Sequence, residues 1–255
     1  MTNTVSSSRN TRSATRKATN VKACKSKTSR ELKTTNDTPT LQGARAPWYA
    51  KFTKDDPEYN AYMANEWGYE KRNDQALFEK LCLEGAQSGL SWRTILNKRE
   101  AYREFFHQFD IERVAQMMDS DIDNILNSNL SGNDMVVRHR GKLESVIQNA
   151  NQLLTMPERQ EGYTNFTDYL WGFVNDKPIL NAWKIASNEV PSKTEESEAM
   201  SKALKRHGFI FVGPTTCYSL MQSCGFVIDH PVDSEEWKAS LARLEKRNGG
   251  FQDRR

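Results

Sequence analysis

A carboxylate between an apolar helix and a glycine-punctuated turn is the first candidate for chemistry in this chain. Glu84 lies in the segment Leu83-Glu84-Gly85-Ala86-Gln87-Ser88-Gly89-Leu90-Ser91-Trp92. Glutamate is almost never fully buried without a partner. The side chain of Glu84 therefore either pairs with a neighbouring group or faces a pocket that receives a cationic ligand.

A second polar and aromatic cluster lies a short distance upstream, at Tyr62 and at Asn65-Glu66-Trp67-Gly68. Aromatic faces attract a cationic ring by roughly 0.5 to 2 kcal/mol per good contact. A carboxylate adds a Coulombic attraction that a neutral ring would not receive, so charge and shape together could discriminate between bases. The two segments predict a pocket for a flat, positively charged ring, although each aromatic residue taken alone is more often part of a core.

Basic residues open a later helix, in Arg138-His139-Arg140-Gly141-Lys142. Backbone N–H groups at a helix start, together with nearby cations, can bind phosphate. A solvated basic face is the competing interpretation from the residues alone.

From about Asp56 to His230 the chain resembles DNA-3-methyladenine glycosylase I, a family of the helix-hairpin-helix superfamily. Four ordered stretches carry the resemblance: Asn65 to Gly68, Leu83 to Trp92, Arg138 to Lys142, and Phe211-Val212-Gly213 through Cys217-Tyr218 to Cys224-Gly225. The resemblance implies an enzyme that excises 3-methyladenine from alkylated double-stranded DNA. It also implies a role for Glu84 in contacting the extruded base, as the catalytic residue.

The resemblance assigns further roles to matching positions. Tyr62 and Trp92 are expected to sandwich the base, with Trp67 as a weaker base-binding candidate. The residues expected to bind DNA are Arg138, Arg140, Gly141, Lys142, Gln87 and Leu90. An apolar wedge at Leu90 would offset part of the unstacking cost, but a place in the core is an equally good interpretation of this leucine.

The chemistry expected of such a site is modest. A base methylated at N3 is already cationic and leaves as a neutral molecule, while the sugar passes through an oxocarbenium-like state. Extrusion of a damaged nucleotide costs a few kcal/mol. No lysine is a strong candidate for a Schiff base, so the enzyme is expected to be monofunctional, without a lyase step.

Two departures from the family pattern stand out. The predicted hairpin turn between Leu126 and Val136 is several residues longer than usual, with Gly132 as the candidate hairpin glycine. Many relatives also bind zinc through two Cys and two His. Of the matching positions Ala50, Met63, His230 and Ser234, only His230 retains a ligand, and a structural zinc site needs about four. We therefore predict no metal and no cofactor.

The periodicity from Trp48 onward is helical, and no segment alternates as a strand would. Asp56-Pro57, Asp74 and Ser91 are predicted to start three helices, the third running through Phe106. Further helices are expected over 111–117, 121–126, 141–154, 166–174, 195–207, 214–224 and 233–246. The expected fold is all-α, a compact helix-hairpin-helix glycosylase-like domain over 45–248, followed by a C-terminal tail over 249–255.

Residues 1–44 are basic, rich in Ser and Thr, and nearly free of large apolar side chains. Such a segment cannot offset its ordering entropy, so we expect a disordered tail. A plain solvated tail, an arm for DNA tethering or nuclear import, and a mitochondrial transit peptide remain open. An intracellular protein is expected, nuclear in a eukaryote and cytoplasmic in a bacterium.

The bulk composition excludes little. The 255 residues carry a net charge of +3, which by itself does not prove a nucleic-acid partner. No apolar run approaches the roughly 20 residues of a membrane span, and we expect a monomer. The four cysteines form no CxxC pair, which favours free thiols in a reducing compartment.

Two other functions fit the sequence less directly. The long hairpin turn, the missing zinc ligands and the basic tail would suit a non-catalytic homologue that binds DNA or its lesions. A glycosylase for another alkylated or deaminated base is the third possibility.

Overall fold

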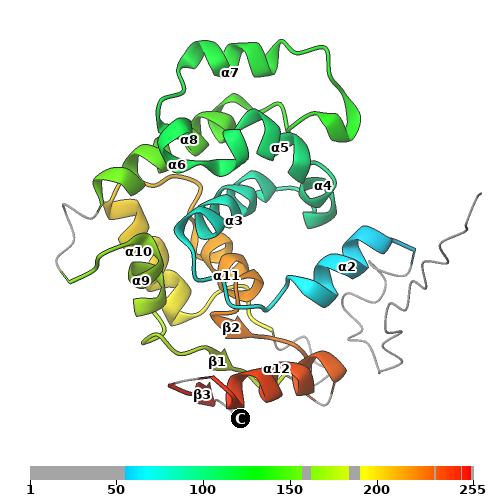
Figure 1. Cartoon of the computed structure of the whole chain (residues 1–255), viewed down its shortest axis with the longest axis vertical. Coiled ribbons are helices and arrows are strands. Elements are labelled where there is room, and N and C mark those ends of the chain that lie inside the picture. The colour runs from blue at the N-terminus through cyan, green and yellow to red at the C-terminus, as the bar shows by residue number, and fades with distance from the viewer. Residues whose placement is uncertain (1–54, 157–161, 184–189, 233, 248, 254–255) are drawn as a thin grey trace, which may run out of the picture. The chain divides into compact units, whose positions relative to one another are not determined.

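The computed structural model describes residues 55–156, 162–183, 190–232, 234–247 and 249–253. The basic segment 1–44, Ala50 and the start of the predicted domain lie outside these residues, so the expectations placed on them stay predictions. The fold is mostly helical, as expected (Figure 1). Its α-helices are α2 (Pro57–Asn65), α3 (Asp74–Gln87), α4 (Trp92–Leu96), α5 (Arg99–Phe105), α6 (Ile111–Ala115), α7 (Asp119–Leu126), α8 (Arg140–Thr155), α9 (Phe166–Gly172), α10 (Glu195–Arg206), α11 (Pro214–Ser223) and α12 (Glu235–Glu245), with 3₁₀ turns η1 (His107–Phe109) and η2 (Gly132–Asp134).

A small parallel sheet was not expected from the sequence. Its strands are β1 (Ile179–Leu180), β2 (Val227–Ile228) and β3 (Gln252–Asp253), in the order β2-β1-β3. In register, Ile179 pairs with Val227 on one side and with Gln252 on the other. Strands of two residues are too short to show alternation in a sequence. The strand β3 lies inside the segment predicted as a C-terminal tail.

Helix starts follow local capping chemistry. Asp56 caps α2 and Ser91 caps α4, each accepting a backbone hydrogen bond as predicted. The prediction for Asp74 is wrong, because Asn73 caps α3. The Asp74 carboxylate instead accepts the backbone N–H of Thr167 over 2.8 Å and so ties α3 to α9. The predicted continuous helix after Ser91 is broken into α4 and α5.

The central helix of the core is α3, which contacts α4, α8, α9 and α11 (Figure 1). Leu77, Leu81 and Leu83 on this helix are almost completely buried, which confirms the predicted apolar stripe. Because apolar packing holds α3 on several sides, its C-terminal end is a firm platform for the polar side chains it carries.

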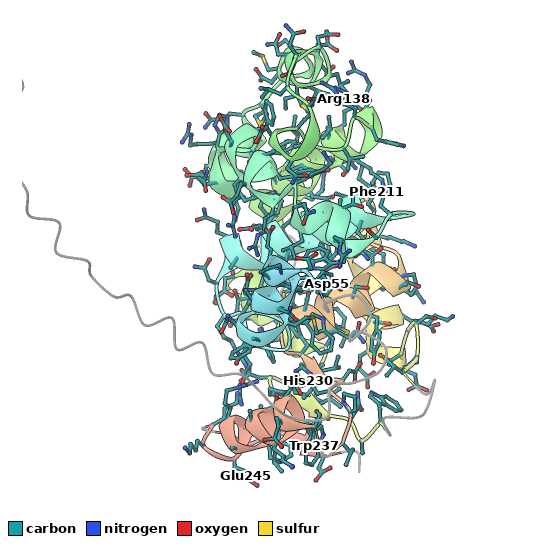
Figure 2. The ribbon with its side chains drawn as sticks, turned by 90° about the vertical axis from the view of Figure 1, so that its right-hand side faces the viewer. Asp55, Arg138, Phe211, His230, Trp237 and Glu245 are labelled. Carbon is teal, nitrogen blue, oxygen red and sulfur yellow. The ribbon has the colours of Figure 1, made fainter. Side chains whose placement is uncertain are left out.

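The described elements extend between two ends, with the candidate site in the middle. Arg138, at the start of the segment into α8, lies toward one end in the view of Figure 2, and Trp237 and Glu245 of α12 lie toward the other. Between them lie α2, α3 and α11, which supply the site described next. Among the described helices, none combines the length and the apolar character needed to cross a membrane.

Candidate active site

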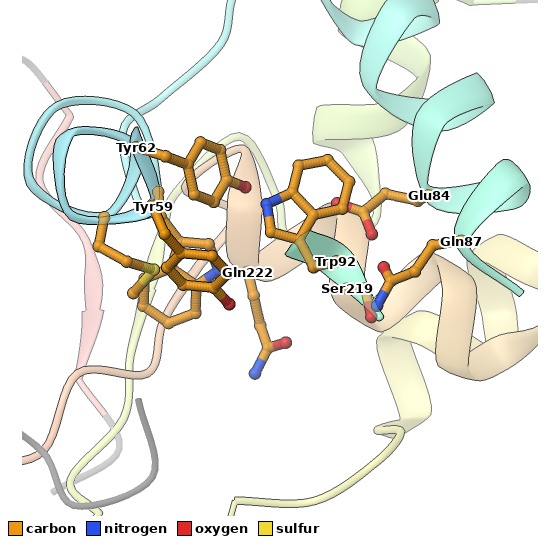
Figure 3. Close-up of a pocket in the computed structure, with 9 residues that line it drawn as sticks. Tyr59, Tyr62, Glu84, Gln87, Trp92, Ser219 and Gln222 are labelled. Atoms are coloured by element: carbon orange, nitrogen blue, oxygen red, sulfur yellow. The ribbon is translucent and has the colours of Figure 1, made fainter. Parts of the chain in front are cut away.

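A small cavity of about 160 Å³ lies among α2, α3, α4 and α11, next to the predicted carboxylate (Figure 3). It is lined by Tyr59, Tyr62, Met63, Trp67, Glu84, Gln87, Trp92, Ser219 and Gln222. Drug-sized pockets usually measure about 300 to 1,000 Å³. A cavity of this size suits a single heterocyclic ring better than a whole nucleotide.

Glu84 lies at the wall of this cavity and is only 5% exposed. Its Oε1 atom lies 2.9 Å from Lys80 Nζ and accepts a hydrogen bond from Ser223 Oγ over 3.0 Å. From the sequence, a paired carboxylate and a carboxylate facing a pocket were alternatives, and in the structure Glu84 is both paired and at the wall of a cavity.

Lys80 is the main residue that sequence reasoning missed. It is 4% exposed, and its ammonium donates to Tyr62 Oη over 3.1 Å and lies 3.8 Å from the ring centroid of Trp92. Burial disfavours its charged form, but Glu84 and Tyr62 outweigh this effect, and the pKa of Lys80 is raised. Lys80 therefore stays protonated. Its position four residues before Glu84 on a helix was the signal that could have revealed the pair.

The aromatic residues are brought together, but not as a sandwich. The ring centroids of Tyr62 and Trp92 are 5.3 Å apart and the planes are inclined by 40°. A base between two rings needs about 7 Å, twice a contact distance of roughly 3.5 Å. The predicted sandwich is therefore absent from this structure, and the hollow lies beside the two rings. Trp92 Nε1 is buried and has no hydrogen-bond partner among the described residues.

Trp67 lines the cavity as expected and is 7% exposed. Its ring packs edge-on against His230, with centroids 4.8 Å apart. It thus joins the cavity to the start of the C-terminal segment, which gives it a structural role beside any contact with a base.

Further lining residues were not singled out from the sequence. Tyr59 and Met63 lie four residues apart on α2, and Ser219 and Gln222 lie three residues apart on α11. Helical spacing puts such residues on one face, but only tertiary packing aims that face at Glu84.

Two residues that were expected to bind DNA lie at the end of α3 and just beyond it: Gln87 is its last residue, and Leu90 is in the following turn. Gln87 lines the cavity itself, whereas Leu90 is 40% exposed. The interpretation of Leu90 as core is therefore wrong, and an exposed apolar side chain beside the pocket suits a wedge.

Lys142 does not have the role expected of it. It is 7% exposed, and its ammonium donates to the carbonyl oxygens of Ala86, over 2.9 Å, and Ser88, over 2.6 Å. Burial lowers the pKa of Lys142. The predicted phosphate contact is wrong because this side chain caps the carboxyl end of α3.

The hairpin joins α7 to α8, as the resemblance implies. Gly132 adopts φ +62°, a left-handed conformation that favours glycine. Arg138 donates to the carbonyl oxygens of Ser128 and Leu130 and so closes the long turn. Arg140 is exposed and pairs with Asp123 and Glu144. Arg140 and Gly141 lie in the first turn of α8, and their expected contact with phosphate stays a prediction.

His230, which matches a zinc-ligand position of the resembled family, is 2% exposed and packs against Trp67. In the part of the chain that the structure describes, no three His, Cys, Asp or Glu side chains are grouped to hold a metal ion. The prediction that the protein binds no zinc stays a prediction.

Comparison with known proteins gives a consistent result. Residues 52–237 match a family model described as methyladenine glycosylase. The chain is 48% identical over 186 residues to DNA-3-methyladenine glycosylase of Haemophilus influenzae, covering 73% of this chain and 94% of that protein. It is 48% identical over 177 residues to DNA-3-methyladenine glycosylase 1 of Escherichia coli, covering 69% and 90%. A solved structure of 3-methyladenine DNA glycosylase I from Staphylococcus aureus, concerned with its recognition of 3-methyladenine, superposes with a TM-score of 0.68 at 36% identity, covering 75% and 97%.

Proposed function

Since the chain belongs to the methyladenine glycosylase family, we propose that it hydrolyses the N-glycosidic bond of 3-methyladenine in alkylated DNA. One observation carries the proposal: the Glu84 carboxylate lies at the wall of a ring-sized cavity that is also lined by four aromatic side chains. Both features match the chemistry of a flat base with hydrogen-bond donors and a delocalised charge.

Recognition would use polar and aromatic groups of the residues that line the cavity. The carboxylate of Glu84 can accept hydrogen bonds from the exocyclic amine of the base. Trp92 Nε1, which has no partner among the described residues, can donate to a ring nitrogen. The rings of Tyr59 and Trp67 supply faces or edges that favour a flat cationic group.

Bond cleavage then needs little covalent help from the protein. The alkylated base is cationic while attached to the sugar, so it departs as a neutral molecule and water attacks C1′ of the oxocarbenium-like sugar. The nucleotide must first leave the duplex. Leu90, exposed on the turn after α3, is placed to enter the space that the nucleotide vacates.

A lyase step is not part of the proposal. Lys80 is the amine close to Glu84, and its raised pKa keeps it as an ammonium that donates to Glu84 and Tyr62. An ammonium has no lone pair with which to attack a sugar carbon. We therefore propose monofunctional hydrolysis.

Duplex DNA is the proposed partner. The start of α8 with Arg140 and Gly141, at the end of the hairpin, would contact phosphate on the same side of α3 as the exposed turn. We propose that the protein acts as a monomer and inside the cell, where its substrate is.

Release of free base from alkylated duplex DNA tests the function. Wild type should release 3-methyladenine, and Glu84→Gln should lower the single-turnover rate by about 10²-fold or more. Glu79→Gln is the matched control, because Glu79 lies on the same helix but pairs with Arg103 away from the cavity. Failure of wild type to release 3-methyladenine, with DNA binding intact, would show a non-catalytic homologue.

A second variant guards against a folding defect in Glu84→Gln, which leaves a buried ammonium without its partner. Trp92→Ala removes a cavity wall and the ring beside the Lys80 ammonium, but it leaves both charged partners, Lys80 and Glu84, in the protein. It should slow release by roughly tenfold or more while the protein keeps its helical circular dichroism.

A further inference from the structure

A buried lysine holds one oxygen of the carboxylate that reads the base. Lys80 and Glu84 lie one turn apart on α3, both are at most 5% exposed, and their charged atoms are 2.9 Å apart. Lys80 does not itself line the cavity, yet its ammonium touches three residues that do: Glu84, Tyr62 and Trp92. This buried ion pair lies next to the cavity, so its electrostatic field acts on any ligand that binds there.

The two carboxylate oxygens of Glu84 are used differently. Oε1 accepts from both Lys80 Nζ and Ser223 Oγ. Among the described residues, no side chain or backbone group donates to Oε2. A carboxylate has capacity for several hydrogen bonds, so Oε2 is the atom left to accept the amine of a base.

The pairing with Lys80 also changes the electrostatic field that Glu84 presents to the cavity. A lone buried carboxylate would attract a cationic base strongly and a neutral one weakly. Because the interaction of unit charges falls only as the inverse of distance, an ammonium in contact with the carboxylate offsets much of its field at the base. The pair Lys80–Glu84 is neutral overall, so hydrogen-bond geometry remains while charge selectivity falls.

We propose that Lys80 is a specificity-determining positioning residue: it fixes Glu84 through Oε1, presents Oε2 to the base, and reduces the preference of the pocket for cationic over neutral adenines. Selection of the lesion is thereby shifted from binding toward bond cleavage, where only a cationic base leaves easily. The inference deepens the proposed function and rests on it.

The test compares two small ligands that differ in one methyl group and in charge. These are 3,9-dimethyladeninium, which mimics the cationic lesion, and neutral 9-methyladenine. Dissociation constants are measured from quenching of the tryptophan fluorescence, since Trp67 and Trp92 line the cavity. In wild type the two constants should lie within about tenfold of one another, because the ion pair is neutral.

Removal of the charge should restore selectivity. In Lys80→Met the ratio of the two constants should rise by roughly tenfold or more in favour of the cation. Lys80→Gln keeps polar contacts without the charge and should raise the ratio in the same way. It replaces Lys80→Met in the test if Lys80→Met folds poorly. Lys80→Arg should keep the wild-type ratio, and Lys202→Met, at an exposed position on α10, is the neutral control.

A pH profile separates this role from a merely structural one. Tyr59 and Tyr62 of α2 and Cys224 at the end of α11 face the pair, and burial raises the pKa of each above its ordinary value, that of Cys224 to about 11. None of these groups changes charge between pH 6 and 8. A new pH dependence of cation binding in Lys80→Met would therefore report protonation of the unpaired Glu84.

The outcomes are distinct. An unchanged ratio in both neutral variants, with 3-methyladenine still released by wild type, overturns the role of Lys80 and leaves the proposed function standing. A rise in Lys80→Arg as large as that in Lys80→Met also overturns it, because packing rather than charge would be the cause. Failure of wild type both to bind the two ligands and to release 3-methyladenine overturns the proposed function and the inference together.

Discussion

The side-chain amide of Gln222 is held by Asp229, with Nε2 donating to Oδ2 over 2.9 Å. Gln222 lines the cavity, and this contact uses one of its two amide N–H donors, which leaves the second N–H and the carbonyl oxygen for a ligand. Asp229 also accepts hydrogen bonds from Asn181, Trp183 and Tyr218 and is 1% exposed. One buried carboxylate thus joins the small sheet region to α11 and orients a residue of the site.

Replacement of Asp229 by Asn should therefore cost stability as well as activity. All four partners donate to the carboxylate of Asp229, so the NH2 group of asparagine would put a donor where an acceptor is needed. We expect a loss of about 2 to 4 kcal/mol in the free energy of unfolding. Urea denaturation followed by circular dichroism measures this loss. Asp119→Asn, at an exposed position in α7, is the control and should change stability by less than about 0.5 kcal/mol. Equal stability of the two variants would contradict the importance of the Asp229 network.

Lys142 and Arg140 lie two residues apart in the basic motif, but their replacement should affect the salt dependence of DNA binding differently. Arg140 is exposed, so Arg140→Ala should reduce the slope of log K against log salt concentration by about 1 if it contacts phosphate. Lys142→Met should leave this slope unchanged, because its ammonium is engaged with Ala86 and Ser88. Fluorescence anisotropy with labelled duplex DNA at several salt concentrations measures both.

The same Lys142→Met variant should be less stable. Two carbonyl oxygens at the end of α3 lose their donor, and we expect a loss of about 1 to 3 kcal/mol. Lys238→Met removes an exposed lysine of α12 and should have little effect on the unfolding midpoint. A salt slope reduced by Lys142→Met without any loss of stability would restore the phosphate role.

Leu90 should matter for catalysis and not for folding. Leu90→Ala truncates a side chain that is 40% exposed, so stability should change by less than about 0.5 kcal/mol. If Leu90 fills the vacated stack, single-turnover release of 3-methyladenine from duplex DNA should fall by roughly tenfold. Release from single-stranded DNA should fall much less. Leu154→Ala, at another exposed leucine on α8, is the matched control and should retain full activity.

The buried thiols should be inert in the folded protein. Cys82, Cys217 and Cys224 are free and buried. Burial raises the pKa of all three thiols, that of Cys217 to about 12 and that of Cys224 to about 11. Little thiolate forms at pH 8. A chromogenic thiol reagent should therefore modify at most one of the four cysteines before unfolding and all four in denaturant. Rapid native modification of two or more thiols would contradict this.

Local signals in the sequence were sufficient for most of the helices. The caps at Asp56 and Ser91 and the stripe of Leu77 and Leu81 were predicted because capping and helical periodicity act over a few residues. The strands were missed because each pairs two residues with partners far along the chain, and such short segments carry no periodic pattern.

The candidate site divides in the same way. The motifs identified Glu84, Tyr62, Trp67 and Trp92 as pocket residues, and all four line one cavity. The motifs did not show that the rings of Tyr62 and Trp92 touch each other, nor that Lys142 turns inward to α3. Residue type and spacing say which side chains can react, but not which atoms neighbouring elements have already engaged.

The sequence by itself determined the helical class, the family resemblance and the carboxylate on which the site depends. Only the tertiary structure decided the electrostatic state of that carboxylate, because α2, α3 and α11 bring Tyr62, Lys80 and Ser223 around Glu84. The physical reason is that the electrostatic interaction of a carboxylate with a ligand depends on its burial and on the charged and polar groups within a few ångströms. Both are set only when distant segments of the chain pack together.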